Sequence, residues 1–521
     1  MPAHTRSRHM PMLWLALFLA ILALPAAPGA AHQGEVEVVI GTTDFPRTLD
    51  PADTTDYPSW ELLTHLYTGL ARQIPGSLRY ELALASDHRV SEDGLTHTFI
   101  VRPDATFADG TPITASTFVR SIRRVMALGR DAADLLNRYI VEVSEGEGNA
   151  VRFTLSIPLP DFEAFVALPP FFPLHPEVYP AEALLDEEAS QTIIGNGPYR
   201  LESFRPGREA VLTPNPAYDG PAPANNRLVL RRYSLPIDLR LALLAREIHV
   251  AWRALALPDL DVVAQEPGIL IRQQPNLQVY YLLFNHDREP FDDPAVRQAF
   301  ALLVDRELSA GRGFDNTVTP LYSLLPPQLG STAVPFPTYD LEQAEAVLME
   351  AGYRPRRRTV RVPLYISTET YGDLMADAAQ ELRRGIEESE MIDISAINND
   401  QTGAFTRAVY RGEYIDAIIG WRPPLASPAG YLIPLAHSSQ RIPGNGHYGS
   451  PQIDDLLRTA AQTTDAGQRD ALYQEVQTLL LNDYALVPLW QGQDVIAFWA
   501  DVSGVIVEAN SWLRYDALAL P

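Results

Sequence analysis

The sequence contains no cysteine and no lysine among its 521 residues. The absence of cysteine excludes disulfides, thiolate metal sites, cysteine nucleophiles and lipid attachment to cysteine. All 41 basic residues are therefore arginines, and 65 acidic residues give a formal net charge of −24. A surface this acidic repels phosphate backbones and anionic lipid faces, so we expect no nucleic-acid partner.

Long apolar runs are also absent, apart from one segment near the N-terminus. Arg6 and Arg8 precede an apolar run from Met12 to Leu24, and Gly29 and Ala31 follow as small residues. A basic start, a short apolar run and a small-residue cleavage site are typical of a secretory signal peptide. We therefore expect residues 1–31 to be a cleaved signal peptide and the mature chain to be free in the periplasm, without a lipid anchor.

The remaining chain alternates between strand and helix patterns, which favours an α/β architecture. Its length exceeds what one hydrophobic core usually supports, so we expect two or three lobes. The continuous apolar run from Gln278 to Asn285 predicts a central strand that is buried on both faces. Other predicted strands include 36–40, 209–214, 360–366 and 486–489, and predicted helices include 60–70, 114–128, 374–386 and one after the Asp293 cap.

The chain lacks the motifs of several enzyme classes. It has no G-x-S-x-G, no H-E-x-x-H and no P-loop, and Gly146 and Gly148 lie in a predicted hairpin turn. We therefore predict that the protein is not an enzyme and has no cofactor. His437 and His447 are not spaced as in known metal sites, so a carrier of nickel or a metal chelate is kept only as an alternative.

Several segments follow one another in an order that is typical of a known family. They are RPDATFADGTPITA (102–115), GNGPYRL (195–201), NPAYDG (215–220), FNHDREPFDDPAVRQAFALLVDRE (284–307), the 339–353 helix, the Trp421 segment, YGSPQIDDLL (448–457) and VPLW (487–490). This series resembles the family 5 extracytoplasmic solute-binding proteins, the dipeptide, oligopeptide and nickel-chelate receptors of ABC importers. Most of these residues form turns and helix caps, so we expect them to be structural.

The resemblance implies a two-lobed, type II periplasmic-binding-protein-like α/β fold with an extra subdomain in the first lobe. Lobe I would comprise 36–268 and 491–521, including the subdomain at about 56–194, and lobe II would comprise 269–490. A hinge is expected near 268–272 and 488–492. The implied function is the extracytoplasmic substrate-binding component of an ABC transporter. A monomer would capture a small solute, most simply a peptide, and deliver it to the permease in the inner membrane.

One position departs from the family pattern. The aspartate that meets the ammonium group of a bound peptide in the family corresponds here to Pro424, in GWRPPLASP. Another acid must serve, or the ligand lacks a free amine there, which keeps a receptor for a non-peptide solute as an alternative. Asp44, beside Thr43 after the first strand, is the candidate substitute, although it could simply cap a turn. Arg422 could bind a carboxylate through two hydrogen bonds, or lie on the surface.

Aromatic residues are the remaining candidates for the binding site, because such sites are lined by aromatic walls. Trp421 is the strongest candidate, and Tyr57, Tyr448 and Trp490 are weaker because aromatic residues more often pack in the core. Asn445 and His447 are candidates because they lie in a glycine-rich segment, RIPGNGHYGS, of the kind that approaches ligands closely.

Overall fold

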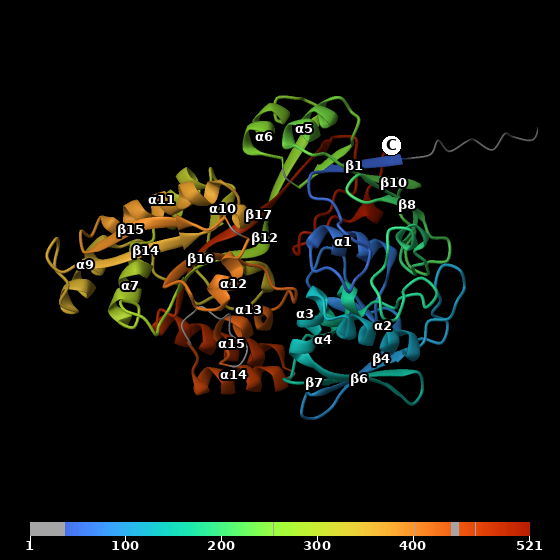
Figure 1. Ribbon diagram of the computed structural model, residues 1–521, viewed down its shortest axis with the longest axis horizontal. Helices are drawn as coiled ribbons and strands as arrows, with labels where there is room; N and C mark the ends of the chain where they lie inside the picture. Colours follow the sequence, from blue (N-terminus) through green and yellow to red (C-terminus); the bar gives the residue numbers. More distant parts are fainter. Residues whose placement is uncertain (1–36, 254, 402, 439–447, 464) are drawn as a thin grey trace, which may run out of the picture. The chain divides into compact units, whose positions relative to one another are not determined.

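A nine-stranded mixed sheet organises the fold (Figure 1). The computed structural model describes residues 37–253, 255–401, 403–438, 448–463 and 465–521. The strand order is β16-β12-β17-β11-β1-β10-β9-β8, with β13 paired to β17. The bounds are β1 Glu37–Thr42, β8 Tyr199–Arg205, β9 Glu209–Pro214, β10 Arg227–Arg232, β11 Val250–Trp252, β12 Ile269–Phe284, β13 Val318–Pro320, β16 Asp416–Trp421 and β17 Leu486–Trp499.

The other strands form smaller sheets. One four-stranded sheet has the order β4-β5-β7-β6, and two pairs are β2-β3 and the parallel β14-β15. The bounds are β2 Ala71–Gln73, β3 Tyr80–Leu82, β4 Ala85–Val90, β5 Thr96–Val101, β6 Ile140–Gly146, β7 Ala150–Leu155, β14 Val360–Ile366 and β15 Ile392–Asn399. Along β5, buried residues alternate with partly exposed ones, as expected of a strand with one face toward the core.

Helices fill the connections between strands, which confirms the predicted α/β class. The bounds are α1 Tyr57–Leu66, α2 Ala115–Leu128, α3 Asp131–Tyr139, α4 Phe162–Val166, α5 Pro236–Leu244, α6 Leu257–Val263, α7 Pro294–Leu303, α8 Arg306–Leu308, α9 Leu341–Glu350, α10 Thr368–Tyr371, α11 Leu374–Glu387, α12 Phe405–Tyr410, α13 Pro428–Ala436, α14 Pro451–Gln462 and α15 Ala466–Asn482. Among the described residues, no helix has the length and apolar composition needed to cross a membrane.

Local sequence signals locate many of these elements. Asp293 caps α7 by accepting a hydrogen bond from Ala295 N at 2.9 Å, and Pro294 occupies the first helical position. The strands β9 and β14 have the predicted bounds. The helix expected at 60–70 begins and ends earlier, because the Asp56 side chain caps α1 by accepting a hydrogen bond from Ser59 N at 2.8 Å.

The predicted lengths of the two longest strands are wrong. β12 begins at Ile269 rather than near 278, and β17 continues to Trp499 rather than ending at Leu489. Polar residues interrupt both strands, so periodicity alone did not reveal their full extent. Each strand supplies the other with hydrogen-bond partners over most of its length. The lobe boundaries and the hinge expected in this region stay predictions.

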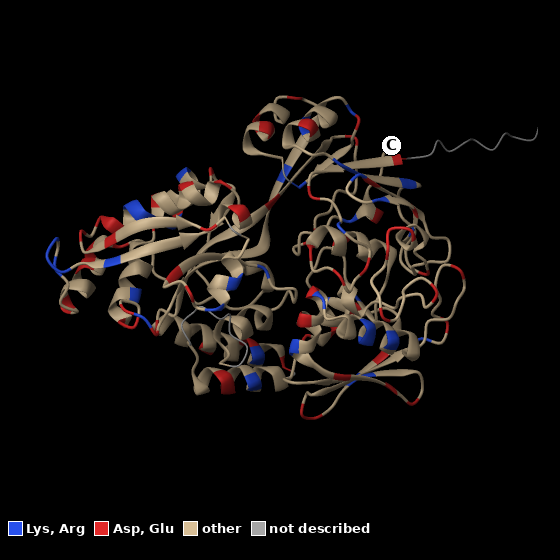
Figure 2. Cartoon of the chain, viewed as in Figure 1, with Lys and Arg blue, Asp and Glu red and all other residues tan. Residues whose placement is uncertain are grey.

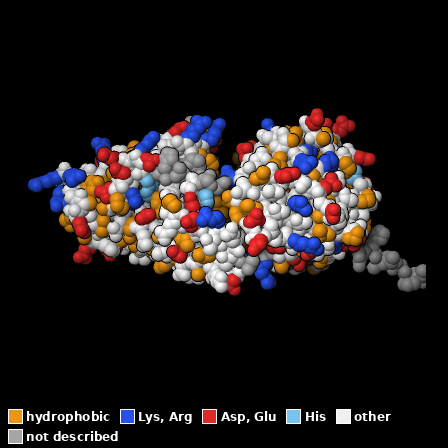
Figure 3. Space-filling view, turned by 90° about the horizontal axis from the view of Figure 1, so that it is seen from below, with side chains coloured by type: hydrophobic (Ala, Val, Ile, Leu, Met, Phe, Trp, Pro, Cys, Tyr) orange, Lys and Arg blue, Asp and Glu red, His pale blue; other side chains and the backbone are white. Residues whose placement is uncertain are grey.

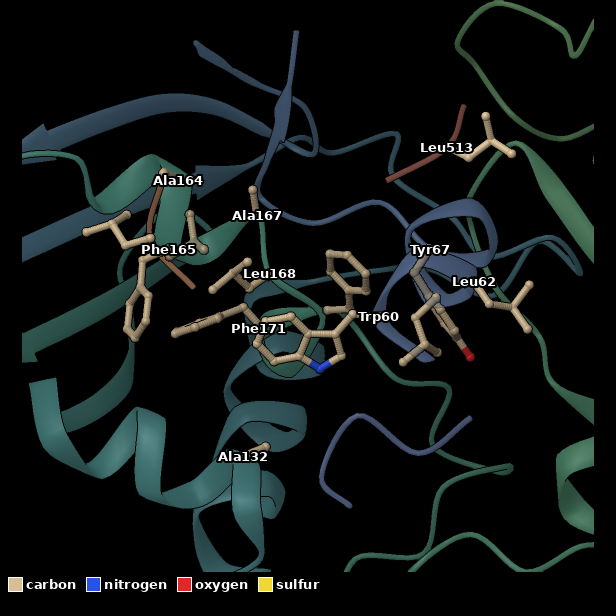
Figure 4. Close-up of a cluster of buried hydrophobic side chains, with 14 of the residues drawn as sticks. Trp60, Leu62, Tyr67, Ala132, Ala164, Phe165, Ala167, Leu168, Phe171 and Leu513 are labelled. Atoms are coloured by element: carbon tan, nitrogen blue, oxygen red, sulfur yellow. The ribbon is translucent and has the colours of Figure 1, made fainter. Parts of the chain in front are cut away.

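Two hydrophobic clusters stabilise the fold. The first cluster surrounds the second half of β12 together with β14, β15 and α11. The second cluster contains α1, α2 and the four-stranded sheet. Trp60 of α1 lies in the second cluster beside Leu168 and Phe171 (Figure 4), and its Nε1 donates to Thr54 O at 3.0 Å. These contacts fix the helix that presents Tyr57.

Charged residues occur mainly on helices and loops, with both signs interspersed (Figure 2). On the face drawn in Figure 3, arginine and acidic side chains are mixed and hydrophobic side chains are scattered. On this face the acidic side chains are therefore interspersed with basic ones rather than gathered in one patch.

Candidate functional site

A break in the pairing of β12 with β17 positions the candidate site. Pro275 pairs with Gln493 and Val279 with Gln491, so that residues 276–278 lie opposite the single residue Gly492. A Cβ added to Gly492 would lie 2.9 Å from Asn276 Oδ1, so a larger residue here would displace the Asn276 side chain. Irregular pairing of this kind redirects side chains out of the regular pattern of the sheet.

Two polar side chains of the broken segment link neighbouring elements. Asn276 Nδ2 donates to Asp494 Oδ1 of β17 at 2.9 Å. Gln278 Oε1 accepts a hydrogen bond from Arg422 Nη2, also at 2.9 Å. The break therefore connects the anion of Asp494 to the cation of Arg422, which follows the end of β16.

Arg422 contacts an aromatic ring and keeps one donor free. Its guanidinium lies over the Tyr57 ring, with 4.3 Å between Cζ and the ring centroid, in the geometry of a cation–π interaction. The Nε of Arg422 is buried and has no hydrogen-bond partner among the described residues. The N-terminal end of α1 holds Tyr57 in place, because Asp56 caps that helix.

Asp494 has one hydrogen-bonded oxygen and one free oxygen. In addition to the bond from Asn276, Oδ1 accepts a hydrogen bond from Ser511 Oγ at 2.9 Å. Oδ2 is buried and, within the described part of the chain, has no partner. Burial raises the pKa of the Asp494 carboxyl, and the nearby positive charges of Arg422 and Arg253 offset part of that rise.

Arg253 supplies the second cation and is more completely bonded. Its Nη2 donates to Glu61 Oε2 at 3.0 Å and to Ser511 O at 2.9 Å, and its Nη1 lies 3.4 Å from Asp44 Oδ2. Glu61 is buried and also accepts hydrogen bonds from Leu513 N at 2.8 Å and from the Tyr515 hydroxyl at 2.6 Å. This network fixes Arg253 at the edge of the site.

An aromatic cavity adjoins these charges. It has a volume of about 330 Å³, within the roughly 300–1,000 Å³ range of small-molecule sites. Tyr57, Trp60, Trp421, Arg422 and Pro424 are among its lining residues. The Nε1 of Trp421 is buried without a partner in the described residues, so the wall of this cavity also offers a free donor.

A smaller cavity shares Tyr57, Trp60 and Arg422 with the first and is also lined by Asn510 and Trp512. Asn510 Oδ1 and Trp512 Nε1 are likewise buried without partners in the part of the chain that is described. Buried polar atoms are normally hydrogen-bonded, and leaving one unpaired is costly. Free donors and acceptors gathered around two connected cavities are therefore typical of a site that binds a polar ligand.

The structure brings four of the predicted site residues together. Asp44, Tyr57, Trp421 and Arg422 belong to the cavities and the charge cluster described above. Thr43 lies beside Asp44 and is partly exposed. Asp44 has an ion pair with Arg253, but 56% of its side chain is exposed to solvent.

Two other predicted residues, Trp490 and Tyr448, lie elsewhere. Trp490 is fully buried among Tyr280 and Phe314, and its Nε1 donates to Ser309 Oγ at 3.1 Å, which corresponds to core packing. The Tyr448 hydroxyl donates to Asp483 Oδ2 at 2.8 Å, next to α15. Asn445 and His447 lie outside the described residues.

Sequence reasoning missed Asp494, Arg253, Asn276 and Gln278. Asp494 was overlooked because the last long strand was expected to end at Leu489. A carboxylate within the otherwise uncharged segment VPLWQGQDVIAFW was the available signal, since charged residues are rarely buried without a partner. Within the described residues, no group of three or more histidine or acidic side chains is arranged to hold a metal ion.

Comparison with known proteins places this geometry in context. Residues 79–442 match the model for bacterial extracellular solute-binding proteins, family 5. The probable D,D-dipeptide-binding periplasmic protein DdpA of Escherichia coli is 29% identical over 508 residues, covering 94% of this chain and 95% of that protein. Di/tripeptide-binding protein 2 of Pseudomonas aeruginosa is 27% identical, covering 91% and 93%. The periplasmic binding protein DppA of Helicobacter pylori, solved with the peptide STSA, superimposes with a TM-score of 0.74 at 22% identity, covering 93% and 98%.

Proposed function

The chain belongs to family 5 of the bacterial extracellular solute-binding proteins, and we propose that it captures a short peptide for the permease of an ABC importer. The curated relatives named above are described as binders of dipeptides or of di- and tripeptides. Residues 1–31 would be removed during export, and the mature chain would act as a monomer in the periplasm. It would release its ligand chemically unaltered, as a binding protein and not an enzyme.

The observation that carries this proposal is a set of free polar atoms that belong to residues lining the aromatic cavities or, for Asp494, to a residue near the lining residue Arg422. Trp421 Nε1, Trp512 Nε1 and Arg422 Nε are free donors, whereas Asp494 Oδ2 and Asn510 Oδ1 are free acceptors. A peptide carries carbonyl and carboxylate acceptors as well as amide and ammonium donors, so it could satisfy both kinds. Tyr57, Trp60 and Trp421 would pack against its apolar parts.

The proposed ligand site is bounded by segments distant in sequence, at the ends of β1, β11 and β16 and the break between β12 and β17. Asp44 and Arg253 would lie at its edge, and Tyr57 and Arg422 at its centre. The hinge expected near 268–272 and 488–492 would allow lobe I (36–268 and 491–521) to close against lobe II (269–490). A ligand that contacts both lobes would favour the closed state, which the permease would recognise.

Calorimetric titration of the purified mature chain tests the proposal. We expect alanine di- and tripeptides to bind with micromolar dissociation constants and to be recovered intact by mass spectrometry. Nickel and its chelates form the comparison arm for the alternative function. If they or a co-purified non-peptide solute bind while peptides do not, the peptide assignment is wrong.

Substitution of a wall residue sharpens this test. Trp421→Ala should weaken peptide binding about 100-fold, since a well-packed aromatic anchor contributes roughly 2–4 kcal/mol. Trp499→Ala is the matched control, because Trp499 donates to Leu243 O at 2.9 Å at the far end of β17. That variant should lose stability while its folded form keeps the wild-type affinity. Equal losses of affinity in both variants would contradict a specific role for Trp421.

A further inference from the structure

The carboxylates that interact with Arg253 and Arg422 outnumber these two cations. Glu61, Asp44 and Asp494 contribute three carboxylates, whereas Arg253 and Arg422 contribute two guanidinium groups, so the cluster carries 2 − 3 = −1 when all are ionised. Arg253 already bonds to Glu61 and lies 3.4 Å from Asp44. The unbalanced charge is therefore associated mainly with Asp494.

The side of Asp494 that faces Arg422 is incompletely satisfied. Arg422 donates to the neutral Gln278 rather than forming an ion pair within 4.0 Å of Asp494. Its guanidinium lies over Tyr57, a ring face that attracts cations. Asp494 Oδ2 consequently has neither a hydrogen bond nor a close cation within the described ranges. A buried carboxylate in this state costs free energy unless a further donor reaches it.

A second free acceptor, Asn510 Oδ1, belongs to the residue just before Ser511, which is hydrogen-bonded to Asp494. Asn510 Oδ1 is buried without a partner, and the next residue, Ser511, donates its hydroxyl to Asp494 Oδ1. An ammonium group carries three N–H donors and a positive charge. It could bond to Asp494 Oδ2 and Asn510 Oδ1, and it would bring the charge of the cluster from −1 to zero.

Asp44 fits this role less well. Its side chain is 56% exposed, and its carboxylate already faces Arg253. An exposed ion pair gains little free energy, because water screens it. The position at which the family pattern has an aspartate is Pro424, which lines both cavities but has no side-chain acceptor.

We infer that Asp494 binds the primary ammonium group of the ligand, with Asn510 as a second acceptor. The ligand is accordingly a peptide with a free amino terminus. This inference rests on the proposed function, because it assigns one end of the peptide to one part of the proposed site. The ammonium group of the ligand is thus held by Asp494 on the long strand β17, and not by the segment that follows β16.

Paired ligands and paired variants test this assignment. Alanine di- and tripeptides and their N-acetyl forms are titrated into the wild-type mature chain by calorimetry. We expect the free-amine peptides to bind at least 100-fold more tightly than the acetylated ones. Asp494→Asn should weaken binding of the free amines about 100-fold and change binding of the acetylated forms less than threefold. Asp494→Ser serves as a second variant, since it removes the charge with a smaller side chain.

Asp416→Asn is the matched control, because Asp416 is a buried aspartate at the opposite end of β16 from Trp421. It should preserve the preference for free amines within about threefold. If the preference persists in both Asp494 variants, or if Asp44→Asn alone abolishes it, the assignment to Asp494 is wrong while peptide binding stands. If the wild-type chain binds none of these peptides, the proposed function fails and this inference fails with it. Far-ultraviolet circular dichroism of each variant confirms that it is folded.

Discussion

Two pairings of an aspartate with an arginine in this protein differ in how completely they are hydrogen-bonded. Asp50 and Arg124 are almost fully enclosed, with side chains 1% exposed, and they form two bonds to each other at 2.9 and 2.6 Å. Asp50 also accepts from Ala52 N and Leu185 N, at 3.0 and 2.8 Å. Arg422 and Asp494, by contrast, do not bond directly and each keeps a buried polar atom without a partner within the described residues.

The difference indicates separate roles for similar chemistry. Remaining donors of Arg124 reach Pro180 O at 2.6 Å and Ala183 O at 2.7 Å, so this pair has nothing left to offer a ligand. Its role is to join α2 to the loop after β1. Arg422, with its unmet bond, lines a cavity of about 330 Å³, a size suited to small molecules, and its positive charge lies near Asp494. Completeness of bonding, rather than burial or charge alone, separates a structural pair from a candidate binding pair.

The largest expected effect comes from breaking the satisfied pair. Arg124→Met should lower the free energy of unfolding by about 3–5 kcal/mol, because it leaves the buried Asp50 carboxylate without its cation. Urea unfolding followed by circular dichroism measures the change. Replacing both residues, as in Asp50→Leu with Arg124→Met, should recover much of the loss. If Arg124→Met lowers the free energy of unfolding by less than about 1 kcal/mol, the Asp50–Arg124 pair does not have the structural role that distinguishes it from Asp494 and Arg422.

A buried histidine extends the comparison to a group that burial keeps neutral. His65 Nε2 lies 3.0 Å from Leu513 O, and the ring stacks on Tyr515 at 4.1 Å. Burial lowers the pKa of His65 from 6.5 to about 4, although the negative charge of Asp516 raises it in part. The unfolded chain therefore binds a proton that the folded chain does not, and stability falls as the pH decreases from 6.5 to about 4.

The expected loss attributable to His65 over that range is about 3 kcal/mol, since one pKa unit corresponds to about 1.4 kcal/mol. His65→Gln should keep a donor for Leu513 O and remove this part of the pH dependence. Urea unfolding of both proteins at pH 7 and pH 4.5 provides the measurement. Parallel stability curves for the wild type and the variant would show that His65 does not titrate as described.

The smallest expected effect on stability is at the candidate site. Asp494→Asn should change the free energy of unfolding by less than about 1 kcal/mol in the absence of ligand. The variant removes a buried charge that lacks a full partner, and this gain offsets the lost attraction to Arg422 and Arg253. Thermal and urea unfolding at pH 7 test it. A loss comparable to that of Arg124→Met would mean that Asp494 is structural in the same sense as Asp50.

Much of the architecture was predictable from local patterns. Alternation located β9 and β14, a continuous apolar run located the buried half of β12, and caps located α7 and α9. Four of the candidate site residues, Asp44, Tyr57, Trp421 and Arg422, do lie near one another. Trp490 illustrates the limit, because an aromatic residue beside a polar segment looks the same in sequence whether its ring lines a cavity or fills the core.

The sequence by itself determined the α/β class, the positions of most strands and helices, and the family. These properties depend on neighbouring residues and on ordered motifs. Only the tertiary structure decided that Asp494 is among the carboxylates left incompletely bonded. That outcome depends on the pairing of β12 with β17, which brings Asn276, Arg422, Asp494 and Ser511 together from across more than 230 residues. Whether a buried atom has a partner is a property of these distant contacts, and no local pattern records it.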